Sequence, residues 1–173
     1  RHLGQTGVLV ANVMLPDGRH EAPAMPAVML GGASIIRKAV IDQVGSFPRE
    51  FFRQAEEYDL SMRVWNAGWS IERFEDIVFR HDKHPGGRPG ALTARMDLRN
   101  NLIIAERYLP RAIRQVYRRD WAQRYGAIGR SNGHRRAAQR ARAEAVGWAI
   151  RESLVGRQTI SPATVEVVFE LER

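Results

Sequence analysis

The first 80 residues alternate short apolar runs with turn residues, a pattern typical of strands in an α/β domain. Residues 7–14 are almost entirely apolar and predict a buried strand, which Pro-Asp-Gly at 16–18 ends with a turn. Residues 69–74 alternate apolar and polar side chains and predict a second strand, and Ile-Val-Phe at 77–79 predicts a third. These runs supply the strands of an α/β layer.

Helical signals are clearest at residues 55–67, where acids fill the first turn, the position that the helix dipole favours for them. Gly68 ends this helix, and Gly45 ends a shorter one over 37–44, because glycine adopts the left-handed conformation at little cost. The rest of the chain is mostly helical, with helices predicted over 93–109, 112–125 (interrupted by glycines 126, 129 and 133), 135–154 and from Ser161-Pro162 onward.

The order of these elements predicts the α/β fold class with a helical extension at the carboxyl end. We expect an α/β part over residues 1–110 and a basic helical extension over residues 111–173. No stretch approaches the about 18 uninterrupted apolar residues that a membrane-spanning helix needs. The first residue is Arg1 rather than Met, so we expect that the natural amino terminus lies upstream.

The net charge of +8 is concentrated in one segment. Between Arg111 and Arg142, ten arginines accompany a single acid, Asp120. This segment either packs on the domain with a solvated arginine face, lies on an anionic membrane surface through its tyrosines and Trp121, or binds nucleic acid. No recognisable nucleic-acid motif accompanies the charge, so peripheral membrane contact through residues 111–142 is the main alternative to simple packing. The chain has no cysteine, which excludes disulfides, thiolate zinc sites and a cysteine nucleophile and fits a cytoplasmic protein.

The acidic start of the predicted helix over 55–67 carries the candidate chemistry. Glu56, Glu57 and Asp59 lie within four residues and repel one another, so at least one should have a raised pKa unless a cation or a sugar hydroxyl compensates. Glu57 is the best candidate for a general base, because a base must reach the proton of the acceptor from a rigid position. The alternative from spacing alone is an ordinary solvated helix start.

A series of short motifs follows in order along residues 31–69: Gly-Gly-Ala-Ser-Ile-Ile-Arg at 31–37, Val-Gly-Ser-Phe at 44–47, Phe-Phe at 51–52, Glu-Glu-Tyr-Asp-Leu-Ser-Met-Arg at 56–63 and Ala-Gly-Trp at 67–69. Their order and spacing resemble the second half of family 2 glycosyltransferases, in the bacterial branch that includes rhamnosyltransferase-like enzymes of surface-polysaccharide synthesis. Arg-Asn-Asn at 99–101, with Gly156-Arg157 and Ser161-Pro162, resembles that branch as well. The resemblance covers residues 7–110 well and the tail more loosely.

The resemblance implies a partial GT-A fold that lacks its amino-terminal nucleotide-binding half. It also implies inverting transfer of a sugar from a nucleotide-sugar donor to a saccharide or lipid-linked acceptor, in polysaccharide or glycolipid synthesis at the cytoplasmic face of the cell membrane. The catalytic base of the family corresponds to Glu57, where glutamate replaces the commoner aspartate. Glu56 is then a hydrogen-bonding neighbour and Asp59 a support of the helix. The implied substrate-binding residues are Gly31, Gly32, Ala33, Arg63, Trp69 and Arg88.

Some members of the family place a histidine beside the diphosphate or the metal, so the resemblance assigns His81 to the metal site, with His84 nearby in the same loop. An exposed loop histidine is the alternative. The complete enzyme is expected to need a divalent cation, Mg or Mn, to neutralise the leaving diphosphate. No Asp-x-Asp motif occurs in the chain, so we expect most of the metal ligands in the missing half and no transfer by this chain alone.

Two other classes of function compete with the transferase. Glycoside hydrolysis also uses two carboxylates, but Glu56 and Glu57 are adjacent on one helix and are poorly placed to flank a bond from opposite sides. A non-catalytic basic module would instead bind an anionic membrane or nucleic acid through residues 111–142.

Overall fold

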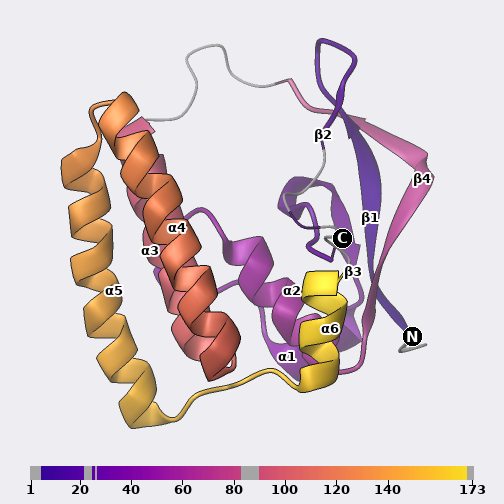
Figure 1. The fold of residues 1–173 in the computed structure, drawn as a ribbon. Coiled ribbons are helices and arrows are strands. Elements are labelled where there is room, and N and C mark those ends of the chain that lie inside the picture. The colour runs from indigo at the N-terminus through magenta and orange to yellow at the C-terminus, as the bar shows by residue number, and fades with distance from the viewer. Residues whose placement is uncertain (1–4, 22–24, 26, 83–89, 171–173) are drawn as a thin grey trace. The chain divides into compact units, whose positions relative to one another are not determined.

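The structure is a computed structural model that describes residues 5–21, 25, 27–82 and 90–170 (Figure 1). It has the predicted mixed α/β composition, and its residues fall into two compact units that are interleaved along the chain. The first unit comprises Arg1–Pro48, Glu57–Gly87 and Ser161–Arg173, and the second comprises Arg49–Glu56 and Arg88–Ile160. The expected single boundary after residue 110 differs from this division, because α3 (Gly90–Tyr108) packs with the helices that follow it.

The first unit is built on a small mixed sheet with β1 (Thr6–Met14) at its centre. β4 (Ser70–Arg80) runs parallel to β1 along one edge. β2 (His20–Glu21) and β3 (Ser34–Ile36) both pair antiparallel with the other edge, β2 near the end of β1 and β3 nearer its start. The predicted buried strand over residues 7–14 is confirmed within one residue, and its buried apolar side chains are Val8, Val10, Ala11 and Val13.

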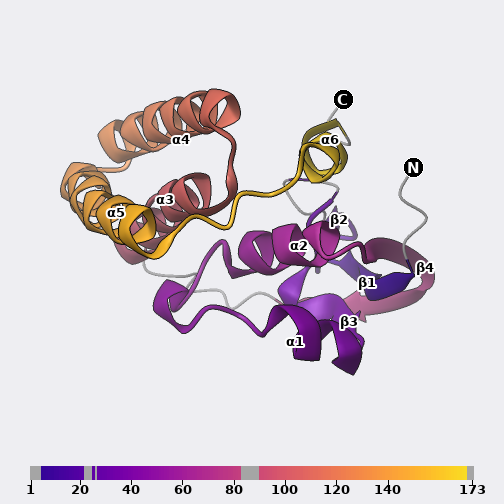
Figure 2. The same ribbon diagram turned by 90° about the horizontal axis from the view of Figure 1, so that it is seen from below.

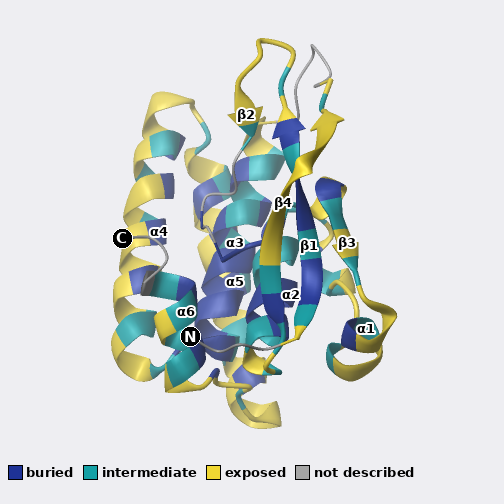
Figure 3. Cartoon of the chain, turned by 90° about the vertical axis from the view of Figure 1, so that its right-hand side faces the viewer, coloured by how far each residue is buried: buried dark blue, intermediate teal, exposed yellow. Residues whose placement is uncertain are grey.

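β4 is one continuous strand, so the prediction of two separate strands over residues 69–74 and 77–79 was wrong. The pairing jumps within it, because Ala11 lies opposite Phe74 whereas the next residue of β1, Asn12, lies opposite Val78. The Asn12 side chain donates to the Glu75 carbonyl at 3.2 Å and so supports the bulged residues. The bulge interrupts the alternation of apolar and polar residues in the sequence, although the backbone of β4 stays in the sheet. Most of β4 is exposed, in contrast to β1 (Figure 3).

Three helices complete the first unit: α1 (Lys38–Val44), α2 (Glu56–Asn66, from Glu57 onward) and α6 (Pro162–Glu170). α1 and α2 end near Gly45 and Gly68, as predicted. Both glycines have a positive φ, 78° and 86°, which ends a helix. Apolar residues of α1, α2, β1 and the segment before β3 form the buried cluster of this unit: Val8, Val10, Met29, Val40, Leu60 and Val64.

α6 begins at the predicted Ser-Pro sequence. The Ser161 hydroxyl accepts a hydrogen bond from the Thr164 amide at 3.1 Å, as expected of a capping residue. The Ser161 amide in turn donates to Asn66 Oδ1 at 2.8 Å, at the last residue of α2. The carboxyl-terminal helix is therefore attached to the end of α2.

The second unit is a bundle in which α3, α4 (Arg111–Ser131) and α5 (Arg135–Val155) lie side by side (Figures 1 and 2). α3 is the most buried of them, with Leu98, Ile103 and Ile104 fully covered. The short helix η2 (Arg49–Phe51) belongs to the same unit and buries Phe51. α5 packs through small residues, which let the helix axes approach closely: Ala138, Ala141 and Ala145.

α4 continues to Ser131, so the expected interruption at Gly126 and Gly129 was wrong. Glycine costs a helix only about 1 kcal/mol relative to alanine, and packing at four-residue intervals outweighs that cost. The packed positions are Tyr117, Trp121 and Tyr125, which are buried, and the Trp121 and Tyr125 rings stack with centroids 5.6 Å apart.

The aromatic face of α4 is bound to α3. The hydroxyl of Tyr117 donates to Asn101, and that of Tyr125 donates to Asp97. These side chains form the inner face of a bundle helix, while many arginines of α4 lie on the opposite face. None of the helices in the described part of the chain has the length and apolarity needed to cross a membrane.

Some arginines of the basic segment are used inside the bundle. Glu106 on α3 is buried, and its carboxylate pairs with Arg118 on α4 and with Arg157 beyond α5, while Arg114 lies 3.9 Å away. Because a buried carboxylate needs compensating charge, these contacts hold the ends of the helices together. The solvated basic surface is therefore smaller than the sequence count indicates.

Candidate active site at the start of α2

The backbone that leads into α2 is strained. Phe52, Gln54 and Ala55 have φ values of 58°, 68° and 61°, in the left-handed region that residues with a β-carbon rarely adopt. Each such residue costs on the order of 1–3 kcal/mol and persists only where its surroundings enforce it. Such strain gathers at functional sites, and here it immediately precedes the acidic turn.

The side chain of Asn100 on α3 enforces this conformation. Asn100 is fully buried, and its amide nitrogen donates to the carbonyls of Phe51, Arg53 and Gln54 at 3.1, 2.8 and 2.7 Å. The neighbouring Arg99 donates to the carbonyl of Glu50. Arg-Asn-Asn at 99–101 is one of the motifs found in the sequence, but this clamp was not predicted from it. A signal was present, because Asn100 stands among apolar positions of a predicted helix.

Glu57, the predicted base, lies against Gly31 within the first unit. A β-carbon placed on Gly31 would be 2.7 Å from Glu57 Oε1 and 3.1 Å from its Cγ, closer than real side chains approach. A β-carbon on Gly32 would meet no heavy atom within 4 Å. Glu57 is partly buried. The structure thus brings together Glu57 and Gly31, two of the predicted site residues, and Gly31 leaves the space that the carboxylate occupies.

The topology of the sheet explains why this contact lies where it does. β1 and β4 are parallel and α2 comes between them in sequence, so α2 runs back against the strands and its first turn points toward their carboxyl ends. Ser34 pairs with Val10 in the second half of β1, and Gly31 precedes Ser34 by three residues. The carboxyl ends of parallel strands are where ligands bind in open α/β sheets.

Asp59, the predicted support of the helix, pairs with Arg63 of the same helix. Its side chain is buried and accepts from Arg63 Nε at 2.9 Å, one helical turn later. Arg63 also donates to the carbonyls of Val44 and Ser46, the latter at 2.9 Å. This network ties α2 to the end of α1, so the charge of Asp59 is compensated by a guanidinium. Substrate binding by Arg63 stays untested, and its contacts here are with the protein.

Glu56 belongs to the second unit. Its Oε2 is buried and has no hydrogen-bond partner in the described part of the chain, a state that costs about 1–3 kcal/mol. Asp97 of the same unit has a raised pKa, first because of its burial and further because of the negative charge of Glu56; hydrogen bonds from Tyr125 and Asn101 oppose the shift. The start of α2 thus adds negative charge to the surroundings of Asp97, and the positive charge of Arg124 opposes its effect on the pKa of Asp97.

Trp69 and Ala33, two predicted substrate-binding residues, pack within the first unit. Ala33 is buried, and Trp69 packs against the core and donates from its indole nitrogen to Gln43 at 2.7 Å. The helix from Glu57 to Asn66 is about 14 Å long, and Trp69 follows its far end. The structure therefore does not bring Trp69 together with Glu57.

His81 follows β4, where its amide donates to the Met14 carbonyl at 2.9 Å. Its Nδ1 lies 2.5 Å from a carboxylate oxygen of Glu21, and no group of three or more His, Asp or Glu side chains suited to a metal occurs among the described residues. The role of His81 at a metal therefore stays a prediction, and the contact that the structure gives its ring is with Glu21. Arg88, a predicted substrate-binding residue, and His84 lie outside the described residues.

Comparison of the chain with models of known protein families, with curated proteins and with solved structures finds no match. A function for this chain therefore rests on its own residues and on their geometry.

Proposed function

We propose that this chain is the acceptor-side part of an inverting glycosyltransferase of the GT-A type, with Glu57 as the general base. The observation that carries the proposal is the contact between Glu57 and Gly31. It places a carboxylate on the first turn of a fixed helix, partly buried, at the sheet edge where α/β proteins bind ligands. The motif order along residues 31–69 supports the same assignment.

In the proposed reaction, Glu57 takes the proton of an acceptor hydroxyl while the hydroxyl oxygen attacks the anomeric carbon of the donor. The new C–O bond forms on the face opposite the leaving group, which inverts the configuration. The nucleoside diphosphate departs with the electron pair of the broken bond. The Asp59–Arg63 pair contributes by holding α2 in place, since a base is efficient only when its position is fixed.

The donor and the diphosphate need groups beyond those that the described residues supply. We infer that an upstream half binds the nucleotide sugar and holds most of the ligands of a Mg or Mn ion. The acceptor is a saccharide or a lipid-linked saccharide, and the enzyme works at the cytoplasmic face of the membrane in the synthesis of surface polysaccharide or glycolipid.

The test uses the protein expressed with its natural upstream sequence and follows release of nucleoside diphosphate. Glu57→Gln keeps the size of the side chain but cannot take a proton, so kcat should fall by roughly 10²–10⁴-fold while acceptor binding persists. Glu75→Gln, on the exposed part of β4, is the matched control and should retain activity. Full turnover by Glu57→Gln would remove Glu57 from the mechanism.

A further inference from the structure

The outward face of α5 combines positive charge with exposed apolar side chains. In its first half, Arg136 and Arg140 are exposed. In its second half, Val146, Ile150 and Leu154 follow one another at intervals of four residues, with 56%, 57% and 81% of their surfaces exposed. Residues four apart lie on one face of a helix, so the three side chains form a continuous apolar stripe. We call this surface, Arg136 and Arg140 with the stripe, the outer face of α5.

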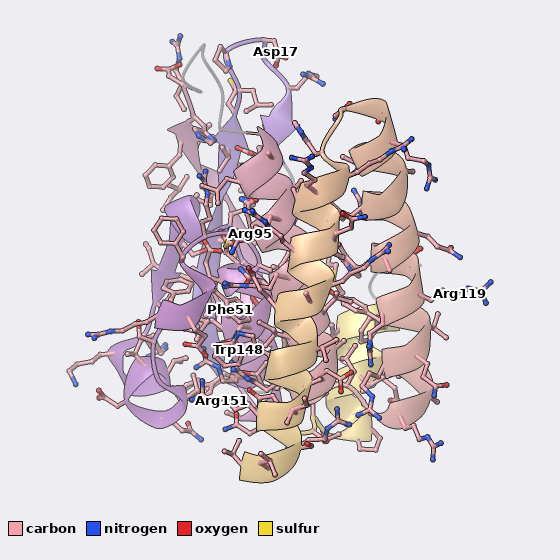
Figure 4. The ribbon with its side chains drawn as sticks, turned by 90° about the vertical axis from the view of Figure 1, so that its left-hand side faces the viewer. Asp17, Phe51, Arg95, Arg119, Trp148 and Arg151 are labelled. Atoms are coloured by element: carbon pink, nitrogen blue, oxygen red, sulfur yellow. The ribbon has the colours of Figure 1, made fainter. Side chains whose placement is uncertain are left out.

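Acidic side chains are absent from this face, although α5 contains two. Glu144 pairs with Arg95 of α3, and Glu152 is buried and pairs with Arg107 of α3 at 2.9 Å. Every residue of α5 is described, and none of the exposed ones is acidic. Figure 4 looks onto this side of the bundle, with α5 in front. No acid of α5 therefore compensates the charge of the outer face.

The bundle itself does not use the stripe. α5 attaches to α3 through its alanines and through Trp148, whose ring lies 5.9 Å from the Arg107 guanidinium. Val146, Ile150 and Leu154 lie on the opposite side of the helix. Three large apolar side chains in a row on an exposed surface mark an interaction site more often than an accident of composition.

We propose that the outer face of α5 binds the surface of an anionic lipid bilayer. A helix lies in the membrane interface when one face is apolar and basic residues flank it, because the apolar side chains enter the acyl boundary while arginines meet anionic headgroups. The stripe from Val146 to Leu154 spans about 12 Å along the helix. It suits a helix that lies on the membrane and does not cross it.

A second copy of the chain fits this face less well. In a parallel pairing of two α5 helices, arginines would oppose arginines. In an antiparallel pairing, Arg136 and Arg140 would lie against the apolar stripe of the other copy, with no acid within the face to compensate them. Like charges and unpaired buried charges are both unfavourable at an interface, whereas anionic headgroups match the face along its whole length.

This surface differs from the one that the sequence indicated. There, the alternative to simple packing placed the tyrosines and the tryptophan of α4 on the membrane, but these side chains are buried between α4 and its neighbours. The outer face of α5 reaches past residue 142 to Leu154, and its apolar part lies entirely beyond the segment 111–142. The inference does not depend on Glu57 being a base, so either proposal can fail without the other.

The test is co-sedimentation of the full chain with vesicles of phosphatidylcholine, alone or with one third phosphatidylglycerol. We expect binding to the anionic vesicles only, weakened by salt. Ile150→Ser with Leu154→Ser should weaken binding by roughly tenfold or more, because both side chains lose apolar burial. Arg136→Gln and Arg140→Gln should each weaken it about fivefold.

The control variants lie on α4 and match these changes. Val116→Ser removes an apolar side chain that is 70% exposed, and Arg119→Gln removes an arginine that points away from the bundle (Figure 4); neither should change binding. Circular dichroism checks that each variant is folded. The proposal is overturned if the chain does not bind anionic vesicles, or if the α4 control variants weaken vesicle binding as much as the α5 variants do. It is equally overturned if the chain binds duplex DNA and not the vesicles. The same holds if Ile150→Ser with Leu154→Ser abolishes a dimer seen by light scattering and leaves vesicle binding intact.

Discussion

At Gly31, a hydrogen atom in place of a side chain decides where the carboxylate of Glu57 can lie. The two residues are 26 positions apart in sequence, and only the fold brings them together. Each could be predicted as a site residue from its motif, and Glu57 also because a general base needs a rigid position. The reason for glycine at position 31 could not be predicted from the sequence. It is the short distance between residue 31 and the Glu57 side chain, which lie in different segments, and no local pattern encodes that distance.

Gly31→Ala is therefore expected to reduce activity more than stability. The new β-carbon would lie 2.7 Å from Glu57 Oε1, the far end of a flexible side chain, so Glu57 moves aside at a cost within about 1 kcal/mol. A shift of about 1 Å in a catalytic group lowers kcat by up to roughly 100-fold. Urea unfolding of the chain measures the first effect, and turnover of the protein with its upstream sequence measures the second.

Gly32→Ala is the neighbouring control, since a β-carbon there meets no atom within 4 Å. It should leave stability near that of the unmodified protein and lower kcat much less than Gly31→Ala does. Equal losses of activity in the two variants would show that the segment tolerates no side chain at all, and the specific role of the Gly31–Glu57 contact would be refuted.

At the scale of elements, the sequence correctly predicted the features that depend on local conformation, such as the ends of helices. The helix ends at Gly45 and Gly68 were correct because a left-handed glycine stops a helix whatever surrounds it. The continuation of α4 through Gly126 was missed because its aromatic side chains pack on α3, and tertiary packing outweighs helix propensity. The continuity of β4 was missed for the same reason, since its bulge is supported by Asn12 of another strand.

The clamp between α3 and the segment before α2 gives a prediction at this scale. Asn100→Ala leaves the carbonyls of Phe51, Arg53 and Gln54 without their donor and removes the restraint on a strained backbone. An unsatisfied buried carbonyl costs about 1–3 kcal/mol, so we expect the free energy of unfolding to fall by about 2–4 kcal/mol. Chemical denaturation measures this directly.

Asn132→Ala is the matched control, because Asn132 is exposed at the end of α4 and its stabilising contact there is made by its backbone amide. It should change stability by no more than about 0.5 kcal/mol. A loss at Asn100 no larger than at Asn132 would mean that the segment before α2 keeps its conformation without the clamp.

At the scale of the whole molecule, the chain passes between its two compact units four times, after residues 48, 56, 87 and 160. The change in composition near Arg111 marks the start of a basic helix, but it does not mark a boundary of folding. α3 precedes that point and still belongs with α4 and α5. Composition reports which residues face water, whereas a unit is defined by which helices share a core, so the division could not be predicted from charge.

The exposed strand β4 determines how whole molecules are expected to associate. Among the described residues β4 pairs with β1 alone, and it exposes Phe74, Ile77, Val78 and Phe79 to between 40% and 52%. A long exposed edge strand offers unpaired backbone groups to another chain, and lysine on such an edge blocks pairing. Val78→Lys should therefore weaken concentration-dependent self-association of the 173-residue chain by more than about tenfold, since pairing would bury or oppose the new charges. Sedimentation velocity over a range of concentrations measures this, with Val116→Lys on α4 as the control, an apolar position that is more exposed than Val78 and lies away from any strand edge. Self-association that falls equally in both variants would reflect net charge and would rule out pairing through β4.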